Sequence, residues 1–222
     1  MFLDLNGKPM KTWSVFTGCC FSCAYCWAKR MAETRLAKSP KYARGFEPTF
    51  HPKELNKMFK PDEFVFISSM GDISFIAPAD FQSILTVIAN SPETTFLLQT
   101  KNPRCFVTSE KSFPNIIVGT TIETNRDTSQ ISEAPLPKDR YHSLCLIPAR
   151  HFLSIEPIMD FDLDGLLRWI EDINPEIIEI GADNYKNNLP EPSWDKVENL
   201  LDELTYLGFE VKQKEGLERL RR

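Results

Sequence analysis

Residues 18–30 read GCCFSCAYCWAKR, and this stretch decides which fold and which chemistry the chain is expected to have. Cys19, Cys23 and Cys26 are spaced four and three positions apart, directly after an apolar run and at the start of a helical pattern. Thiolates so close together on one loop are ligands that soft metal ions and iron-sulfur clusters prefer. Three thiolates serve three irons of a four-iron cubane, so the fourth iron stays open to a cofactor.

Two other interpretations of these cysteines remain open at this level. A structural zinc site also uses closely spaced cysteines, but it takes a fourth ligand, and neither Cys105 nor Cys145 stands at a recognisable spacing from the loop. Buried, inert cysteines are the other alternative. Cys20 adds an ambiguity, because Cys20, Cys23 and Cys26 would form a second, more evenly spaced ligand set.

Short apolar runs alternate with helical patterns along the chain, which is typical of a parallel sheet built from strand–helix units. The predicted strands are residues 13–17, 64–68, 96–100, 116–121, 152–156, 177–181 and 210–213, and the predicted helices are residues 24–37, 79–89, 163–172 and 194–207, with one more within 124–150. Six or seven strands are too few for a closed eight-stranded barrel. The sequence therefore predicts an α/β fold, an incomplete (β/α)6-type TIM-like barrel with parallel strands, in a single domain over residues 1–222.

The composition narrows the class of protein further. With 42% hydrophobic and 26% charged residues, the chain is typical of a globular domain. A net charge of -5 gives no overall positive field, so a polynucleotide would need a local basic groove. No apolar run approaches the roughly 18 residues of a membrane span, and the N-terminus lacks a signal-peptide pattern. We expect a cytoplasmic protein without a membrane partner, whose cysteines are thiols or metal ligands rather than disulfides.

The cysteine spacing, with Tyr25 directly before the last cysteine, resembles the signature of the radical S-adenosylmethionine superfamily. Nearly the full length resembles one small family of that superfamily, related to the phage Gp37/Gp68-like (DUF5131) proteins, through the runs FVFISSMGD (64–72), FLLQTKNP (96–103), IIVGTTIE (116–123), FLSIEPIMD (152–160) and IGADN (180–184). The resemblance to the spore photoproduct lyase branch is weaker. The superfamily's usual spacing makes Cys19, Cys23 and Cys26 the ligands of a 4Fe–4S cluster and leaves Cys20 as a neighbour.

This resemblance implies that S-adenosylmethionine binds the open iron through its amino and carboxylate groups. One electron then cleaves it into methionine and a 5'-deoxyadenosyl radical. The implied cofactor-binding residues lie on the cysteine loop or after strands: Tyr25, Gly71, Asp72, Lys101, Thr121, Glu123, Ser154 and Glu156. Gly71 and Asp72 replace the superfamily's Gly-Gly-Glu element, which receives the cofactor's amino group, and Tyr25 would lie near the adenine. Thr121 and Glu123, two positions apart on a predicted strand, would face the ribose.

Several of these residues have a plain structural alternative. Asp72 is also a good helix cap, and Lys101 is also an ordinary surface lysine. Glu156 would equally serve in a structural ion pair, although a carboxylate among apolar neighbours needs a partner. Asp183 and Asn184, which follow the sixth strand, line a substrate entrance in one interpretation and form a simple turn in the other.

The expected function is that of a radical S-adenosylmethionine enzyme, which abstracts hydrogen from a substrate at the barrel mouth and receives electrons from a flavodoxin- or ferredoxin-type protein. A nucleic-acid base is one candidate substrate, because the run from Lys29 to Arg44 concentrates basic residues; a solvated helix face is the alternative for that run. Two competing classes are a zinc-stabilised nucleic-acid-binding module without catalysis and an electron-transfer iron-sulfur protein, which normally supplies four ligands.

Overall fold

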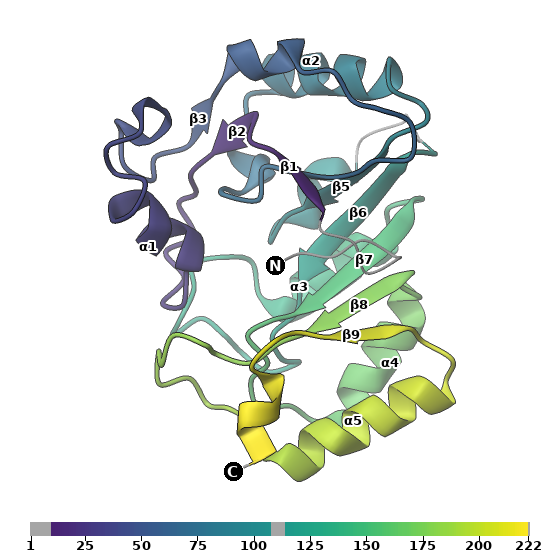
Figure 1. Cartoon of the computed structure of the whole chain (residues 1–222). Coiled ribbons are helices and arrows are strands. Elements are labelled where there is room, and N and C mark those ends of the chain that lie inside the picture. Colours follow the sequence, from purple (N-terminus) through teal and green to yellow (C-terminus); the bar gives the residue numbers. More distant parts are fainter. Residues whose placement is uncertain (1–9, 108–113, 222) are drawn as a thin grey trace.

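In the computed structural model, which describes residues 10–107 and 114–221, seven parallel strands form one curled sheet, an open half-barrel (Figure 1). Along the sheet the strands are β1 (Lys11–Trp13), β4 (Phe64–Ile67), β5 (Thr95–Gln99), β6 (Ile116–Thr121), β7 (Arg150–Ile155), β8 (Ile177–Ile180) and β9 (Val211–Gln213). Each neighbouring pair is parallel. The predicted partial TIM-like barrel is confirmed, with seven strands where the (β/α)6 form has six.

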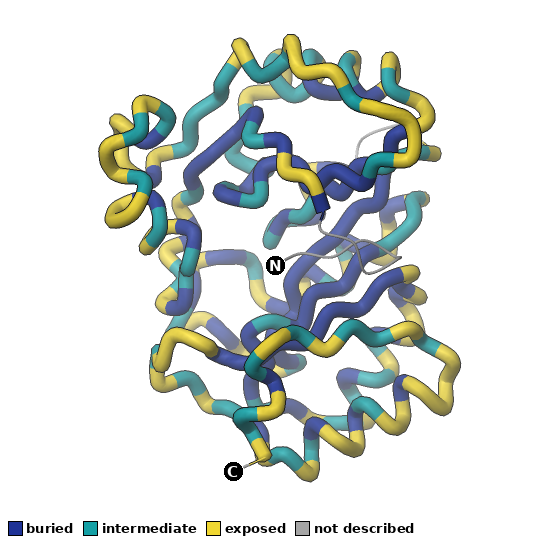
Figure 2. Tube along the Cα trace, viewed as in Figure 1, coloured by how far each residue is buried: buried dark blue, intermediate teal, exposed yellow. Residues whose placement is uncertain are grey.

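The helices are α1 (Trp27–Glu33), α2 (Pro78–Ala89), α3 (Pro137–Cys145), α4 (Leu163–Ile173) and α5 (Trp194–Tyr206). Helices α2 to α5 cover the outer face of this sheet, and the main apolar core lies between the two layers (Figures 1 and 2). Helix α1 instead packs with Tyr42, Phe46 and Met70 in a separate small cluster. In α4, the buried side chains Leu166, Ile170 and Ile173 recur at helical spacing and therefore share one face. Burying such a side chain contributes about 1.5–3 kcal/mol, so this face fixes the helix on the sheet.

Strands β4, β6 and β8 are buried along their whole length, as parallel strands covered on both sides should be. Alternate residues of β4 separate into two clusters: Val65 and Ile67 pack in the main core, whereas Phe64 and Phe66 belong to a second cluster on the opposite face. That second cluster also contains Leu97, Ile117, Phe152 and Ile177. It fills the concave side of the half-barrel, so the carboxyl ends of the strands are left to form a cavity.

The prediction of one strand over residues 13–17 is wrong. The first strand ends at Trp13, and β2 (Phe16–Thr17) leaves the large sheet to pair antiparallel with β3 (Thr49–Phe50). The backbone continues this pairing, because His51 N donates to Val15 O at 2.9 Å. The chain is thereby turned away from the sheet just before the cysteine loop.

The predicted helix over residues 24–37 is shorter, because α1 spans only Trp27–Glu33. Cys26 N donates to Cys23 O at 3.1 Å, so the residues between these cysteines form a turn. Cys26 Sγ then accepts a bond from Lys29 N and caps the helix. The remaining helices lie within two residues of the predicted bounds, and the helix expected within 124–150 is α3.

Short 3-10 helices occupy Pro40–Tyr42, Pro52–Asn56, Ile73–Phe75, Pro103–Phe106 and Leu217–Arg221. The first two lie in the long connection over residues 38–63, which also contains β3. In the part of the chain that the structure describes, no helix is both long and apolar enough to span a bilayer.

Candidate functional site

Two glycines hold the cysteine loop against the end of β4. Gly18 N donates to Met70 O, and Asp72 N donates to Gly18 O, each at 3.0 Å. A Cβ at Gly71 would lie 2.7 Å from the nitrogen and oxygen of Gly18, and Gly18 itself has a φ of +86°, a value that favours glycine. Gly71 therefore allows a close backbone approach of Gly18.

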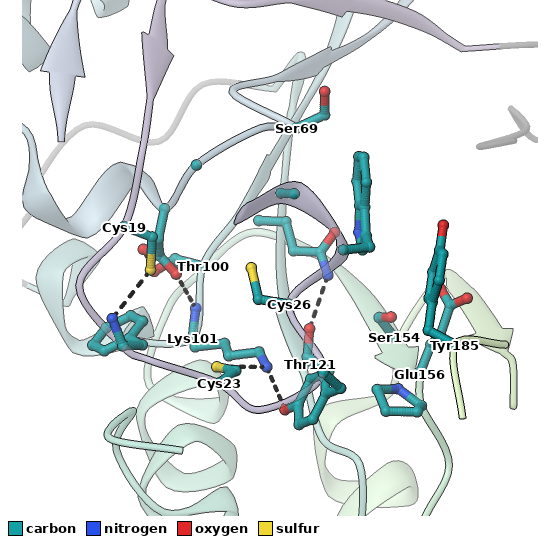
Figure 3. Close-up of a pocket in the computed structure, with 18 of the residues that line it drawn as sticks. Cys19, Cys23, Cys26, Ser69, Thr100, Lys101, Thr121, Ser154, Glu156 and Tyr185 are labelled. Carbon is teal, nitrogen blue, oxygen red and sulfur yellow. Dashed lines mark hydrogen bonds between the residues drawn. The ribbon is translucent and has the colours of Figure 1, made fainter. Parts of the chain in front are cut away.

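The loop places three thiols around one cavity at the carboxyl ends of the strands. Cys19, Cys23 and Cys26 all line this cavity (Figure 3). Cys20 is exposed and lies outside the lining, as do Cys105 and Cys145. The geometry therefore groups Cys19, rather than Cys20, with the other two cysteines of the motif.

Each of the three sulfurs has a hydrogen-bonding neighbour. Phe21 N donates to Cys19 Sγ at 3.4 Å, and Lys29 N donates to Cys26 Sγ at 3.3 Å. Burial raises the pKa of the Cys19 and Cys26 thiols, and these amide bonds only partly offset it. Both groups are thus protonated thiols at neutral pH, and a bound metal would displace their protons.

The donor set matches an iron-sulfur cluster held by three protein thiolates, which leaves one iron open. The amide donors suit the sulfur atoms of such a site, where hydrogen bonds to sulfur tune the cluster. Among the described residues, the cysteines lie around the cavity without being gathered as a preformed metal site. The residues fit the cluster through their donor chemistry and their shared cavity.

Asp72 both caps a helix and reaches the cavity. Its Oδ1 accepts bonds from Ser74 N at 3.0 Å, Ser74 Oγ at 2.7 Å and Thr100 Oγ1 at 2.6 Å. Its Oδ2 accepts one bond, from Lys101 N at 2.8 Å. The capping interpretation therefore describes Oδ1, while Oδ2 retains acceptor capacity at the cavity wall, since a carboxylate offers about four acceptor sites.

The ends of β5, β6 and β7 supply polar groups to the same wall. Gln99 Nε2 donates to Thr121 Oγ1 at 3.1 Å, and both residues line the cavity with Ser154. Glu156 also lines it, but its Oε2 is paired with Lys214 Nζ at 2.5 Å. The ion-pair alternative for Glu156 is therefore present in the structure, at the edge of the cavity.

The segment after β8 likewise forms a structural turn and lines the cavity. The Asp183 carboxylate accepts bonds from Tyr185 N at 3.1 Å and from Asn187 N at 2.5 Å, which makes the segment a turn. Asp183, Asn184 and Tyr185 nevertheless line the same cavity as the cysteine loop. The Arg30 guanidinium lies 5.4 Å from the centre of the Tyr185 ring, so α1 and this turn meet at the rim.

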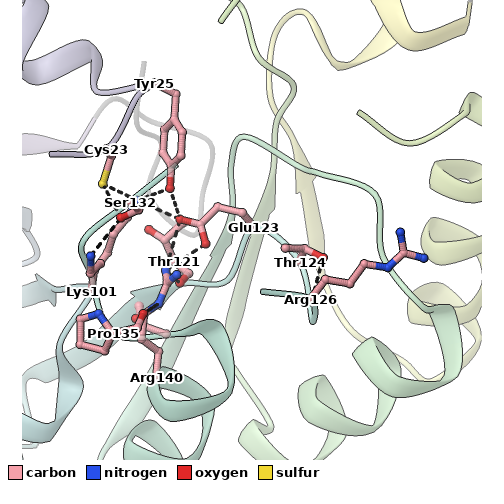
Figure 4. A network of polar contacts seen from close by, with 12 residues as sticks. Cys23, Tyr25, Lys101, Thr121, Glu123, Thr124, Arg126, Ser132, Pro135 and Arg140 are labelled. Carbon is pink, nitrogen blue, oxygen red and sulfur yellow. Dashed lines mark hydrogen bonds and ion pairs between the residues drawn. The ribbon is translucent and has the colours of Figure 1, made fainter. Parts of the chain in front are cut away.

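Glu123 is the one predicted cofactor-binding residue outside the cavity lining. It is fully buried in a polar network (Figure 4), where Arg140 Nη1 lies 2.9 Å from its Oε2 and Lys101 Nζ lies 2.8 Å from its Oε1. Tyr25 donates its hydroxyl to the same carboxylate. Burial opposes ionisation, but Arg140 and Lys101 lower the pKa of Glu123 to about 2.

Sequence reasoning missed Ser132 and Arg140, which complete this network. Ser132 Oγ lies 3.1 Å from Cys23 Sγ, and the Arg140 side chain is fully buried under β6. Both come from the connection over residues 124–150, which carries no motif that would single them out. An arginine is so rarely buried that composition favours the surface for Arg140.

Two residues of the basic run form ion pairs within the protein. Lys41 Nζ lies 2.5 Å from Glu54 Oε1 and also donates to Ser14 O at 3.3 Å. Arg44 pairs with Glu47 at 2.5 Å on the surface. Two cations that the sequence offers for phosphate binding therefore have carboxylate partners already.

A family model described as "Protein of unknown function (DUF5131)" matches residues 9–178, more than half of the chain. No curated protein matches this chain. Among solved structures, spore photoproduct lyase complexed with dinucleoside spore photoproduct is 12% identical, with a TM-score of 0.54 over 77% of this chain and 55% of that one. A mutant of that enzyme with bound AdoMet and dinucleoside spore photoproduct is also 12% identical, with a TM-score of 0.53 over 78% and 55%.

Streptococcus suis SuiB bound to precursor peptide SuiA is 10% identical, with a TM-score of 0.55 over 95% of this chain and 50% of that one. SuiB has also been solved bound to S-adenosylmethionine, with a TM-score of 0.53 at 10% identity over 92% and 49%. At such identities the likeness establishes a shared fold. The chain spans about half the length of these structures.

Proposed function

The chain belongs to the DUF5131 family of proteins of unknown function, and we propose that it is a radical S-adenosylmethionine enzyme whose 4Fe–4S cluster is held by Cys19, Cys23 and Cys26. One observation carries the proposal: the three thiols of the motif line one cavity together with polar groups from the ends of β5 to β8. Ligands of open parallel α/β sheets bind at this edge, beyond the carboxyl ends of the strands.

The solved structures support the proposal through their ligands. Spore photoproduct lyase with bound AdoMet and SuiB bound to S-adenosylmethionine have the same fold as this chain. A fold alone does not assign a ligand. The cysteine loop of this chain supplies the local chemistry that a fold match lacks.

When bound, the cluster and S-adenosylmethionine would supply a one-electron cleavage that yields a 5'-deoxyadenosyl radical. The residues of this chain bind, orient and shield the reactants. Asp72 Oδ2, with its remaining acceptor capacity, is suited to an ammonium group beside the cysteine loop. Thr121 and Gln99, already joined to each other, offer hydroxyl and amide groups for a ribose.

The substrate would occupy the remaining space of the same cavity. Tyr25 and Phe66 give the cavity buried apolar wall, and Asp183, Asn184 and Tyr185 also line it. One of the similar solved structures contains a dinucleoside spore photoproduct, and another contains a precursor peptide. A nucleic-acid substrate and a peptide substrate are therefore both compatible with the proposed function. A flavodoxin- or ferredoxin-type protein would supply the electron.

Anaerobic reconstitution with iron and sulfide tests the cluster and cofactor parts of the proposal. We expect about four iron atoms per chain and an electron paramagnetic resonance spectrum of the reduced protein that changes when S-adenosylmethionine is added. The matched control is Cys23→Ala, which should bind less iron at equal folded content. A colourless protein that binds zinc in place of iron, or a spectrum indifferent to S-adenosylmethionine, would overturn the proposal.

A further inference from the structure

A largely buried lysine contacts the sulfur of one of the three motif cysteines. Lys101 Nζ lies 3.5 Å from Cys23 Sγ, within hydrogen-bonding distance for sulfur, and Figure 3 shows its side chain reaching toward Cys23. The Lys101 side chain is only 16% exposed. A charge that is shielded from water in this way acts on its neighbours much more strongly than a solvated charge does.

A network of charges beneath the loop holds this lysine in place (Figure 4). Lys101 Nζ donates to Tyr25 Oη at 2.5 Å and lies 2.8 Å from Glu123 Oε1. Arg140 Nη1 fixes Glu123 from the other side, through bonds to its carboxylate and to Thr121 O at 2.5 Å. Lys101, Glu123 and Arg140 together leave one net positive charge under Cys23.

Lys101 is paired with a carboxylate in this setting. A lysine is ordinarily protonated at neutral pH, and Glu123 Oε1 lies 2.8 Å from Lys101 Nζ as its counter-charge. The three protons of the ammonium meet three acceptors: Cys23 Sγ, Tyr25 Oη and Glu123 Oε1. To bind a cofactor carboxylate, Lys101 would have to give up one of these contacts.

Cys23 differs in this respect from the other two cysteines. Cys19 and Cys26 each accept a bond from a backbone amide, which is neutral. Cys23 has the Lys101 ammonium and the Ser132 hydroxyl, whose oxygen lies 3.1 Å from Cys23 Sγ. Among the described residues, Cys23 is thus the one motif cysteine whose sulfur accepts a hydrogen bond from a charged side chain.

We propose that Lys101 is a positioning residue for the cluster's redox chemistry: its fixed positive charge on Cys23 Sγ raises the reduction potential of the cluster. The inference rests on the proposed function. Net charge, hydrogen bonds to sulfur and solvent exposure set the potential of an iron-sulfur cluster. Reduction by one electron adds negative charge, so a nearby cation stabilises the reduced form more than the oxidised form.

The test is a redox titration of reconstituted protein without S-adenosylmethionine, followed by electron paramagnetic resonance. Lys101→Met removes the charge, Lys101→Arg keeps it, and Lys29→Met removes an exposed lysine from helix α1. We expect Lys101→Met to lower the reduced-to-oxidised ratio at a fixed potential by at least tenfold, which is about 59 mV for one electron. Lys101→Arg and Lys29→Met should keep the wild-type ratio within twofold.

Lys101→Gln, whose amide still offers donors to Glu123, provides the same charge removal if the methionine variant does not fold. If Lys101→Met and Lys101→Gln fold and bind the cluster but keep the wild-type reduction potential, the inference is overturned. If they keep that potential and lose only affinity for S-adenosylmethionine, the inference is also overturned, and Lys101 is assigned to cofactor binding. A wild-type protein that assembles no cluster refutes the proposed function instead, so the two failures are distinguishable.

Discussion

Gly18 and Gly71 touch backbone to backbone, and a Cβ at Gly71 would stand 2.7 Å from both the nitrogen and the carbonyl oxygen of Gly18. This contact joins the cysteine loop to the end of β4 through the bonds from Gly18 N to Met70 O and from Asp72 N to Gly18 O. Because backbone atoms cannot rotate away as a side chain can, a methyl group at position 71 must displace the loop.

Gly71→Ala should therefore impair the cysteine loop specifically. We expect a loss of about 1–3 kcal/mol in the free energy of unfolding, as for other overpacked sites, and a clear loss of iron loading. Gly165→Ala is the matched control, since its added methyl group meets the Asn125 side-chain amide rather than backbone. Equal iron content in the two folded variants would contradict the anchoring role of Gly71.

The four cysteines of the loop should respond differently to substitution. Cys19→Ala, Cys23→Ala and Cys26→Ala should each lose the oxygen-sensitive visible absorbance, because each removes a thiol that lines the cavity. Cys20→Ala should keep it, because Cys20 is exposed and outside the lining. Absorbance lost in Cys20→Ala and kept in Cys19→Ala would assign the ligands to the tighter spacing.

Glu123→Gln should destabilise the fold, because it leaves Lys101 and Arg140 buried without their counter-charge. Breaking a buried pair costs about 3–5 kcal/mol, whereas the exposed pair of Arg150 and Glu176 should cost at most about 1 kcal/mol in Glu176→Gln. Denaturant titrations at pH 7 measure both. A loss in Glu123→Gln no larger than that of the control would contradict the stabilising role of the network.

The same variant should show a characteristic pH dependence. Folding lowers the pKa of Glu123 from 4.5 to about 2. The stability that its charge contributes is therefore complete above the pKa of the unfolded chain, and it is lost as the pH falls through the pKa of the folded protein. The difference in unfolding free energy between wild type and Glu123→Gln should shrink between pH 5 and pH 3. A constant difference across that range would show that Glu123 does not act through its charge.

The second half of the basic run, residues 38–44, should contribute little to polynucleotide binding. Replacing Lys38, Lys41 and Arg44 together by glutamine should flatten the dependence of log affinity on log salt by no more than about one unit, where about 0.7 to 0.9 per phosphate is expected. The reason is that Lys41 and Arg44 already pair with Glu54 and Glu47. Filter binding of single- and double-stranded DNA and RNA across a salt series measures this slope, and a flattening of two to three units would restore the run as a phosphate-binding surface.

The strands were predictable because most are uninterrupted apolar runs, and β6 (Ile116–Thr121) matches its predicted bounds. The split between β1 and β2 was not predictable, because it depends on pairing with residues 49–51, which lie more than thirty positions away. Helix α1 starts late because Cys23 and Cys26 close a turn, and nothing in its helical spacing reveals this.

The candidate site was predictable where strand ends decide it, and ten of the residues predicted to bind the cluster or the cofactor line the cavity: Cys19, Cys23, Tyr25, Cys26, Gly71, Asp72, Lys101, Thr121, Ser154 and Glu156. Glu123 lies outside the cavity lining because β6 ends at Thr121, so the alternation of strand side chains no longer applies two positions later. Its position is set by Arg140 from α3, a contact across 17 residues. Periodicity cannot reveal such a partner.

The central claim is that this chain cleaves S-adenosylmethionine, and chromatographic measurement of 5'-deoxyadenosine tests it most directly. Reconstituted wild-type protein, reduced with dithionite and given S-adenosylmethionine, should form 5'-deoxyadenosine and methionine in equal amounts without any added substrate, and Cys23→Ala should form neither. A protein that carries its full iron content and binds S-adenosylmethionine, yet forms no 5'-deoxyadenosine above the level of Cys23→Ala, would contradict the claim.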